Sequence, residues 1–184
     1  MRQIETERLI LRPIAPSDAG LALRIASDPG TTRYLYYWGR ATPEAEADRF
    51  LRYAVSVWQE SPQRAWEYCA VRRDTGEAIG NCSVEWVAEG TAELGWILLP
   101  AHRKQGFATE MGRSLLRCAF LTLRADCALA HCDQRNLPSR RVMERLGMTL
   151  QRIAPGARPA KAAGEAPGDE CTYALSRADW ASGR

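Results

Sequence analysis

The sequence predicts a single α/β domain built on one mixed sheet. Its 184 residues suffice for one ordinary domain and hardly for two. Segments with the two-residue alternation of strands are interleaved with segments that have the spacing of helices. Their order is a strand, two helices, a meander of three strands, and then alternating strands and helices that end in two strands. Such an order is typical of a mixed sheet with helices packed against it.

The composition is that of an ordinary globular protein and argues against several functional classes. Hydrophobic residues make up 46% and charged residues 26% of the chain, which is close to average and enough for a core without disulfides. The net charge of +3 is too small to indicate a polyanion-binding protein. No segment approaches the roughly 18 apolar residues of a membrane span, and the first residues lack the apolar core of a signal peptide. We therefore expect a cytoplasmic protein with no membrane or nucleic-acid partner.

The cysteines indicate neither a disulfide framework nor a metal site. The chain has six cysteines and two histidines, without a C-x-x-C pair or the short spacing of zinc ligands. A domain of this size has a core of its own and needs no disulfide bridges. We expect the cysteines to be reduced packing residues, with no metal bound. Their positions are 69, 82, 118, 127, 132 and 171.

The first third of the chain predicts one strand and two helices. Residues 8–14 alternate in the manner of a strand that a proline closes. Ser17-Asp18 is a candidate N-cap for a helix that ends at Asp28-Pro29-Gly30. Thr42-Pro43-Glu44 combines a capping hydroxyl, a proline at the first position and an acid in the first turn, so a second helix starts there. It ends near Ser61-Pro62.

The middle of the chain predicts a meander of strands. Residues 66–71 and 79–84 are rich in β-formers, and residues 74–77 between them are turn formers. Residues 92–99 form a third strand, which Pro100 terminates.

The second half alternates between helices and strands. Apolar residues at helical spacing predict a helix over 108–123, and residues 127–132 predict a strand. A short basic helix over 139–146 ends at a glycine. Two strands follow over 148–153 and 170–175.

The connection between the last two strands is long and rich in proline, glycine and alanine. It covers residues 154–169, which do not form regular structure easily. We predict a flexible loop with two alternative roles. It is either a mobile hairpin loop on the surface or a flap over a substrate cleft.

A basic, glycine-containing loop opens directly into the helix that follows the meander. Amides at a helix N-terminus lack internal partners, which makes this a candidate site for a phosphate or pyrophosphate. We expect Gly106 to let the backbone approach the ligand, Ala108 to keep the first turn small and Thr109 to add a hydroxyl donor. Arg103 and Lys104 supply positive charge. The spacing matches neither of the two common nucleotide-binding loops.

This loop resembles a motif of a known family. Residues 103–108, Arg-Lys-Gln-Gly-Phe-Ala, match the R/Q-x-x-G-x-G/A loop of the GNAT superfamily of acyl-CoA-dependent N-acyltransferases. Four further segments, in the expected order, resemble the RimJ/RimL-like branch of that superfamily: residues 6–12, 92–96, 136–148 and 179–180. The resemblance covers residues 4–180, which we expect to form one N-acetyltransferase domain.

The resemblance implies a fold and a cofactor. The expected fold is a twisted mixed sheet, flanked by helices, whose central parallel strands splay apart. The pantetheine arm of acetyl-CoA, the acetyl donor, would enter between the strand that ends at Leu99 and the strand over 127–132.

The same resemblance implies the residues that bind the cofactor. Its pyrophosphate would lie on the amides of Gln105, Gly106, Phe107, Ala108 and Thr109.

Two further contacts belong to the same expectation. Backbone groups of Ile97, Leu98 and Leu99 would pair with the pantetheine, and one of their N–H groups would stabilise the thioester oxyanion. Asn136 would donate a hydrogen bond to the cofactor; the alternative is a turn residue before Pro138.

Glu93 is the candidate general base. An aliphatic amine is mostly protonated at pH 7, so a base helps to generate the nucleophile. The resemblance implies a carboxylate at this position, and a carboxylate on a largely apolar strand is expected to have a raised pKa. The alternative is a glutamate that faces a sheet edge and pairs with an arginine, in which case Glu85 would be the base.

The sequence departs from the family pattern at the group that protonates the leaving thiolate. Many members carry a tyrosine where this chain has Met143. We expect Ser139 to take over, although it would alternatively cap the helix before Arg140. Tyr173 is a weaker candidate.

The two histidines are weaker candidates for functional residues. His131 and Cys132 would face opposite sides of a strand, which argues against a Cys–His pair, and we expect His131 to be a strand histidine whose hydrogen bonding is satisfied. His102 either contacts the cofactor or has a surface role.

Two further sets of side chains, four arginines and four aromatic residues, each have two alternative roles. The arginines at 135, 140, 141 and 145 form a solvated helix face, with one or two of them near the 3′-phosphate of coenzyme A, rather than a nucleic-acid patch. The aromatic side chains Tyr34, Tyr36, Tyr37 and Trp38 either line the acceptor pocket or pack in the core.

The sequence therefore predicts an acetyl-CoA-dependent N-acetyltransferase. Its acceptor is either a protein N-terminus or a small-molecule amine. The sequence is compatible with a monomer or a homodimer. The alternative, motivated by the missing tyrosine, is a non-catalytic acyl-CoA sensor or interaction protein. A nucleic-acid-binding domain ranks last.

Overall fold

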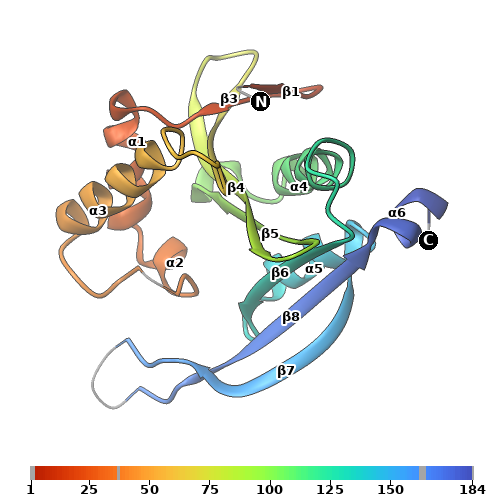
Figure 1. Cartoon of the computed structure of the whole chain (residues 1–184). Helices are drawn as coiled ribbons and strands as arrows, with labels where there is room; N and C mark the ends of the chain where they lie inside the picture. Colours follow the sequence, from red (N-terminus) through yellow and green to blue (C-terminus); the bar gives the residue numbers. More distant parts are fainter. Residues whose placement is uncertain (1–2, 37, 162–164, 184) are drawn as a thin grey trace.

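Eight strands form one sheet, in the order β1-β2-β3-β4-β5-β6-β8-β7 (Figure 1). The structure, a computed structural model, describes residues 3–36, 38–161 and 165–183. The strands are β1 (Ile4–Glu5), β2 (Leu9–Pro13), β3 (Ala65–Arg72), β4 (Ala78–Ala88), β5 (Thr91–Leu98), β6 (Cys127–Asp133), β7 (Thr149–Arg158) and β8 (Gly168–Ser176). The helices are η1 (Pro16–Asp18), α1 (Ala19–Ser27), α2 (Pro29–Thr32), α3 (Pro43–Ser56), η2 (Pro100–His102), α4 (Phe107–Arg117), η3 (Cys118–Thr122), α5 (Leu137–Arg145) and α6 (Arg177–Ser182).

The pairing of β5 with β6 is parallel and short. The strands are in register at Thr91↔Cys127, Ala92↔Ala128 and Glu93↔Leu129. β5 then continues to Leu98 and β6 to Asp133 with no further pair between the described strands. The neighbouring strands on both sides pair in antiparallel fashion. The predicted mixed sheet with splayed central parallel strands is confirmed.

Helices cover both faces of the sheet. Figure 1 shows α1 and α3 side by side on one side of the sheet and α4 on the other. Alternation along β3 follows this arrangement, because Trp66 and Tyr68 pack in the core beneath α4, whereas Cys69 belongs to the core beneath α1 and α3. The face beneath α1 and α3 is the one that carries the site described below.

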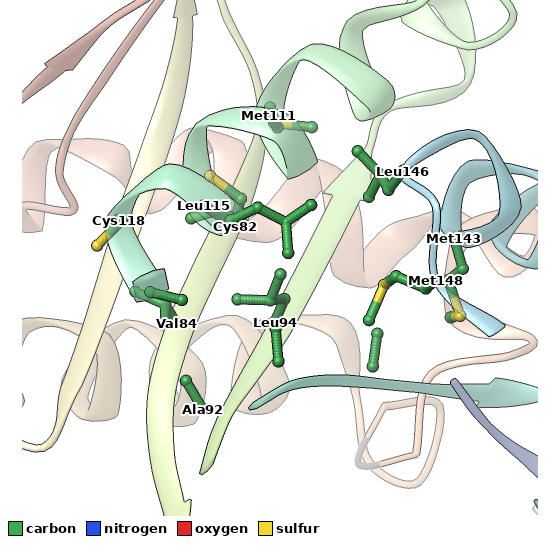
Figure 2. Packing of buried hydrophobic residues seen from close by; sticks show 14 of the residues in the cluster. Cys82, Val84, Ala92, Leu94, Met111, Leu115, Cys118, Met143, Leu146 and Met148 are labelled. Atoms are coloured by element: carbon green, nitrogen blue, oxygen red, sulfur yellow. The ribbon is translucent and has the colours of Figure 1, made fainter. Parts of the chain in front are cut away.

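The larger core lies between α4, α5 and the strands (Figure 2). Met111 and Leu115 on α4 are fully buried and belong to one cluster with Cys82 and Val84 of β4. The two helices approach closely, since a Cβ at Gly112 would lie 2.5 Å from Leu146 Cδ1. Close packing of this kind fixes the C-terminal end of α5, which Leu146 caps, against α4.

Three predicted boundaries are corrected. Helix α4 ends at Arg117 and continues as the π-helical turn η3. The basic helix starts two residues earlier than predicted, at Leu137, because Asn136 caps it. The proline at 29, predicted to end a helix, also begins the short helix α2, where it occupies the first position.

The connection predicted over 154–169 is shorter than expected. β7 runs to Arg158 and β8 starts at Gly168, and these two residues are partners across the ladder. Residues 159–167 remain as the connection, and 162–164 lie outside the described residues. The predicted flexibility of this loop stays a prediction.

Five of the six cysteines are buried, and Cys127 is half-buried. All six are free thiols, and the five buried ones pack in the two cores, as predicted. Among the described residues, no helix has the length and apolar character that crossing a bilayer requires.

Candidate active site

A cavity of about 690 Å³ opens where β5 and β6 separate. The sheet forms its floor, α3 and the segment between α2 and α3 form one wall, and the start of α5 forms another. Three glutamates share the floor. Glu85 lies opposite Glu93, and Glu67 lies opposite Ser83, two residues from Glu85, so alternation places all three carboxylates on one face.

Glu93 interacts with a histidine on the neighbouring strand. Its Oε2 lies 3.7 Å from His131 Nε2. Burial raises the pKa of Glu93, as predicted; His131 and Arg158 oppose that rise, and Glu85 and Glu170 add to it. The alternative of a glutamate that pairs with an arginine at a sheet edge is wrong, because Glu93 lies on a strand paired on both sides and contacts the imidazole of His131.

His131 is held by a second set of contacts. Its Nδ1 lies 3.0 Å from Thr172 Oγ1 and 3.7 Å from Glu170 Oε1. Glu170 in turn pairs with Arg158, at 2.9 Å. The predicted strand histidine with a satisfied hydrogen bond is confirmed by the contact with Thr172. The same imidazole also links Glu93 to β8, which was not predicted. The sequence carries no signal for this, because the register of the parallel pair is set by tertiary packing.

Glu85, the other base candidate, lies in the same cavity. The Tyr53 hydroxyl on α3 donates a hydrogen bond to Glu85 Oε2, at 3.3 Å. Burial raises the pKa of Tyr53, and Glu67 and Glu85 raise it further. The phenol therefore stays protonated and remains a donor to the carboxylate.

Glu67 and Asn81 form a buried pair that sequence reasoning missed. They are 7% and 5% exposed, and Asn81 Nδ2 donates to Glu67 Oε2 at 3.3 Å. Burial raises the pKa of Glu67 to about 8, Asn81 opposes the rise and Glu85 adds to it. Asn81 Oδ1 has no hydrogen-bond partner among the described residues. Position 67 is the polar member of an alternating strand, which predicts exposure, but α3 covers that face.

The start of α5 brings Asn136, Ser139 and Met143 to the cavity wall. Asn136 Oδ1 accepts a hydrogen bond from the Ser139 N–H, at 3.3 Å. Asn136 is therefore the N-cap, and the alternative in which Ser139 caps the helix is wrong. Ser139 and Met143 lie one helical turn apart on the cavity side.

Tyr173 does not line the cavity. It is 2% exposed, and its hydroxyl is bonded to Arg140 at 3.1 Å and to Glu144 at 3.2 Å. Burial raises its pKa, Arg140 opposes that rise and Glu144 adds to it. The suggestion that this hydroxyl acts at the reacting centre is therefore wrong.

The basic loop starts α4 with a left-handed turn. Gly106 has φ +85° and Lys104 has φ 61°, and the helical ladder begins with Glu110 N–H to Gly106 O at 3.0 Å. The amides of residues 107–109 precede that ladder and are available to an anion. Thr109 is 8% exposed, so we expect its amide rather than its hydroxyl to face a ligand.

Arg8 and Arg103 anchor this loop. Arg8 donates to Gln105 O at 2.9 Å, pairs with Glu110 at 2.7 Å and lies 4.5 Å from the centre of the Phe107 ring. Arg103 donates to Leu98 O at 3.0 Å and to a threonine of α2. The guanidinium of Arg103 therefore ties the loop to β5 and α2, and its predicted role in supplying charge for a phosphate stays a prediction. Lys104 is exposed.

Along β5, the backbone N–H and C=O groups of successive residues point alternately toward β4 and toward the opening. Leu99 N–H donates to Ile79 O at 3.0 Å, so in this antiparallel ladder the backbone groups of Leu99 and Ile97 face β4. Those of Leu98 and Trp96 face the opening. Of the three residues predicted to pair with the pantetheine, Leu98 has its N–H toward the opening, whereas the backbone groups of Ile97 and Leu99 face β4.

The second histidine, His102, lies outside the cavity. His102 is 7% exposed, and its Nε2 lies 3.3 Å from Glu77 Oε1 at the turn before β4. The predicted surface role is therefore wrong, and a contact with the cofactor stays a prediction. Among the basic residues of α5, Arg140 bonds to Tyr173 while Arg141 and Arg145 are exposed.

The aromatic segment lines the cavity. Tyr34, Tyr36 and Trp38 contribute to its wall, and Trp38 also packs on Phe50 of α3, with ring centres 5.2 Å apart. The predicted Tyr37 lies outside the described residues. Arg158, at the end of β7, lies 5.4 Å from the centre of the Tyr36 ring. The β7–β8 hairpin therefore borders this wall.

Sequence comparison identifies relatives over most of the chain. Residues 8–149 match the family of the acetyltransferase (GNAT) domain. YoaA of Bacillus subtilis, described as an uncharacterized N-acetyltransferase, is 30% identical over 154 residues, covering 82% of this chain and 84% of its own. YnaD of the same organism, with the same description, is 26% identical over 178 residues, which cover 96% of this chain and 98% of YnaD.

Solved structures share the fold. An acetyltransferase (GNAT family) from Bacillus anthracis has a TM-score of 0.80 at 22% identity, covering 96% of this chain and 99% of its own. RimJ from Mycobacterium smegmatis, solved in complex with CoA-disulfide, has a TM-score of 0.77 at 19% identity, covering 96% and 90%.

Proposed function

Because the chain belongs to the GNAT family of acetyltransferases, we propose that it transfers the acetyl group of acetyl-CoA to a primary amine that attacks the thioester directly. The observation that carries this proposal is the opening between β5 and β6 beside Glu93. Strands that part expose backbone groups with which an amide-rich chain can pair. A carboxylate with a raised pKa at the same place can take the proton that the amine loses.

The residues around the opening fit acetyl-CoA. The amides of residues 107–109, after the turn at Gly106, suit the pyrophosphate, with Lys104 exposed nearby. The backbone groups of Trp96 and Leu98 suit the amides of the pantetheine arm. When bound, acetyl-CoA supplies an activated acetyl group whose C–S bond breaks as the C–N bond to the acceptor forms.

Glu93 is proposed as the general base and His131 as the residue that positions it. Aliphatic amines have a pKa of about 10.4, far above that of an ordinary carboxylate. A raised carboxylate pKa narrows this difference in pKa and so favours transfer of a proton from the acceptor's ammonium to Glu93, which leaves the neutral amine to attack. The imidazole at 3.7 Å keeps part of the carboxylate ionised and fixes its orientation.

Ser139 is proposed to stabilise the leaving thiolate, in place of the tyrosine that Met143 replaces. Both side chains belong to the cavity wall. The thiol of coenzyme A is fairly acidic, so we expect Ser139 to contribute less than Glu93. Asn136 is proposed to combine capping of α5 with a hydrogen bond to the cofactor at the mouth of the opening.

We further propose that the enzyme belongs to the RimJ/RimL-like branch and acts in the cytoplasm. The shared fold with RimJ and the free thiols support this. A wall of α3 and aromatic side chains around the acceptor end favours a small-molecule amine over a protein N-terminus.

Thermal unfolding with and without acetyl-CoA tests the proposal. Ligand at about a hundredfold over Kd stabilises a protein by roughly 2.7 kcal/mol, a shift of several degrees. We expect that shift in the wild type and not in Gly106→Glu, which fills the left-handed turn with a negative charge. A shift without turnover of any amine would instead support the alternative, a non-catalytic acyl-CoA sensor.

A further inference from the structure

We propose that the acceptor carries a second cationic group, which binds between Glu85 and Glu67 at the end of the cavity away from the β5–β6 opening. The acceptor is then an aliphatic diamine or polyamine rather than an amine that carries a carboxylate. The inference rests on the proposed function and names its substrate class.

The three carboxylates form a row that leads away from the reacting centre. Glu93 lies on β5, at the last residue that pairs with β6. Glu85 is its direct partner on β4. Glu67 lies on β3 opposite Ser83, which precedes Glu85 by two residues on β4. Adjacent strands are about 4.8 Å apart, so the row spans roughly the length of a short aliphatic diamine.

An unsatisfied acceptor at the far end of this row points to a ligand. Asn81 is 5% exposed and lines the cavity, and its Oδ1 has no hydrogen-bond partner among the described residues. Its Nδ2 is already committed to Glu67 Oε2. A buried carbonyl oxygen without a donor costs free energy. An ammonium has three donors and no acceptor, so it satisfies Asn81 and Glu67 together.

The surroundings of Glu85 suit a cation in the same way. The Tyr53 hydroxyl donates to Glu85 Oε2, which leaves the other carboxylate oxygen for a ligand. Aromatic side chains at the wall, Phe50 and Trp38 among them, present faces that attract cations.

The basic groups of the cavity are engaged with other acids. Arg158 pairs with Glu170 at 2.9 Å, and Arg49 lies 4.0 Å from Glu46. His131 faces Glu93 rather than the inner end. Among the described residues, Glu67 and Glu85 thus have no basic side chain as an ion-pair partner, which favours a positive ligand at the inner end.

Proton release gives the proposal a readout that does not depend on turnover. Burial raises the pKa of Glu67 to about 8, so at pH 7 the carboxyl is about nine-tenths protonated. A cation bound beside it favours the ionised form. Binding of a diamine is therefore expected to release a proton that a monoamine does not release.

Three amines with the same four-carbon chain make the matched test: butylamine, putrescine and γ-aminobutyrate. We expect kcat/KM for putrescine to exceed that for butylamine by tenfold or more, and γ-aminobutyrate to be the poorest. Calorimetric titration at pH 7, in two buffers with different ionisation enthalpies, should show roughly half a proton or more released with putrescine beyond butylamine.

Two variants and one control assign the effect. Glu67→Gln and Glu85→Gln should each remove most of the preference for putrescine, and Glu67→Gln should abolish the extra proton release. Glu85 is half-buried, so Glu85→Gln still tests the proposal if the Glu67→Gln protein does not fold. Asp48→Asn, at an exposed carboxylate of α3, should change neither.

Equal kcat/KM for putrescine and butylamine, or a preference unaffected by both variants, would overturn the proposal while leaving the acetyltransferase activity intact. Glu67-dependent proton release without acetylation of any amine would support the subsite and contradict the proposed function. The two failures are therefore distinguishable.

Discussion

Glu93 Oε2 on β5 lies 3.7 Å from His131 Nε2 on β6, at the point where the two parallel strands stop pairing. A titratable pair thus spans the strands where they part, beside the proposed thioester site. This placement combines a carboxylate of raised pKa with an imidazole that limits the rise. Both groups depend on the splay of the sheet for access to a substrate.

Replacement of Glu93 tests the general base. Glu93→Gln keeps the shape and removes the proton acceptor, so we expect kcat/KM to fall by about 10²–10⁴. In the wild type, activity should fall as the pH drops through the raised pKa of this carboxyl, because only its ionised form accepts a proton. The variant should lose that acid limb. An unchanged pH profile in Glu93→Gln would rule out this residue as the base.

Replacement of His131 tests the positioning role. His131 lowers the pKa of Glu93, so in His131→Gln that pKa should rise and the acid limb of kcat/KM should move to higher pH. His102→Gln is the matched control, since the chain has two histidines and His102 faces Glu77 instead. If both variants leave the acid limb in place, Glu93 and His131 are not coupled in the reaction.

Gly106→Ala tests the start of α4 as the pyrophosphate site. An added Cβ meets strain at φ +85° and would lie 3.2 Å from Arg8 Nη2. We expect the KM for acetyl-CoA to rise several-fold, because residues 107–109 shift, with little change in kcat. Gly76→Ala is the control, with φ +71° and no atom within 4 Å of the added Cβ. A similar KM in both variants would remove the loop from the cofactor site.

Glu67 makes stability depend on pH. Its pKa is about 8 in the folded state against an ordinary value of 4.5, so between these values the folded state binds more protons than the unfolded state. Stability contributed by this group is therefore lost as the pH rises through that window. Relative to Glu67→Gln, the wild type should lose roughly 1–3 kcal/mol of unfolding free energy between pH 5.5 and 8.5, measured by urea denaturation. Parallel curves for the two proteins would contradict the raised pKa.

The order of elements and the splayed sheet were predictable from the sequence. Strand alternation, the strong start at Thr42-Pro43 and the loop before α4 act locally, and the GNAT motifs supplied the topology. The same family resemblance pointed to Glu93 and Ser139, and both line the cavity.

The contacts between distant segments were not predictable in the same way. The Glu93–His131 contact depends on the register of a parallel pair, and the burial of Glu67 depends on how α3 covers the sheet. The contacts of Arg103 with α2 and with the end of β5 likewise join segments that are distant in the sequence. Such side-chain partners are set by tertiary packing, on which the sequence pattern carries little information.

The most direct test of the proposed chemistry is a product count. Purified protein with acetyl-CoA and putrescine should release one thiol for each N-acetylated amine detected by mass spectrometry, and Glu93→Gln should lower both rates together. Saturable binding of acetyl-CoA without acetylation of any primary amine would contradict this account and favour a sensor.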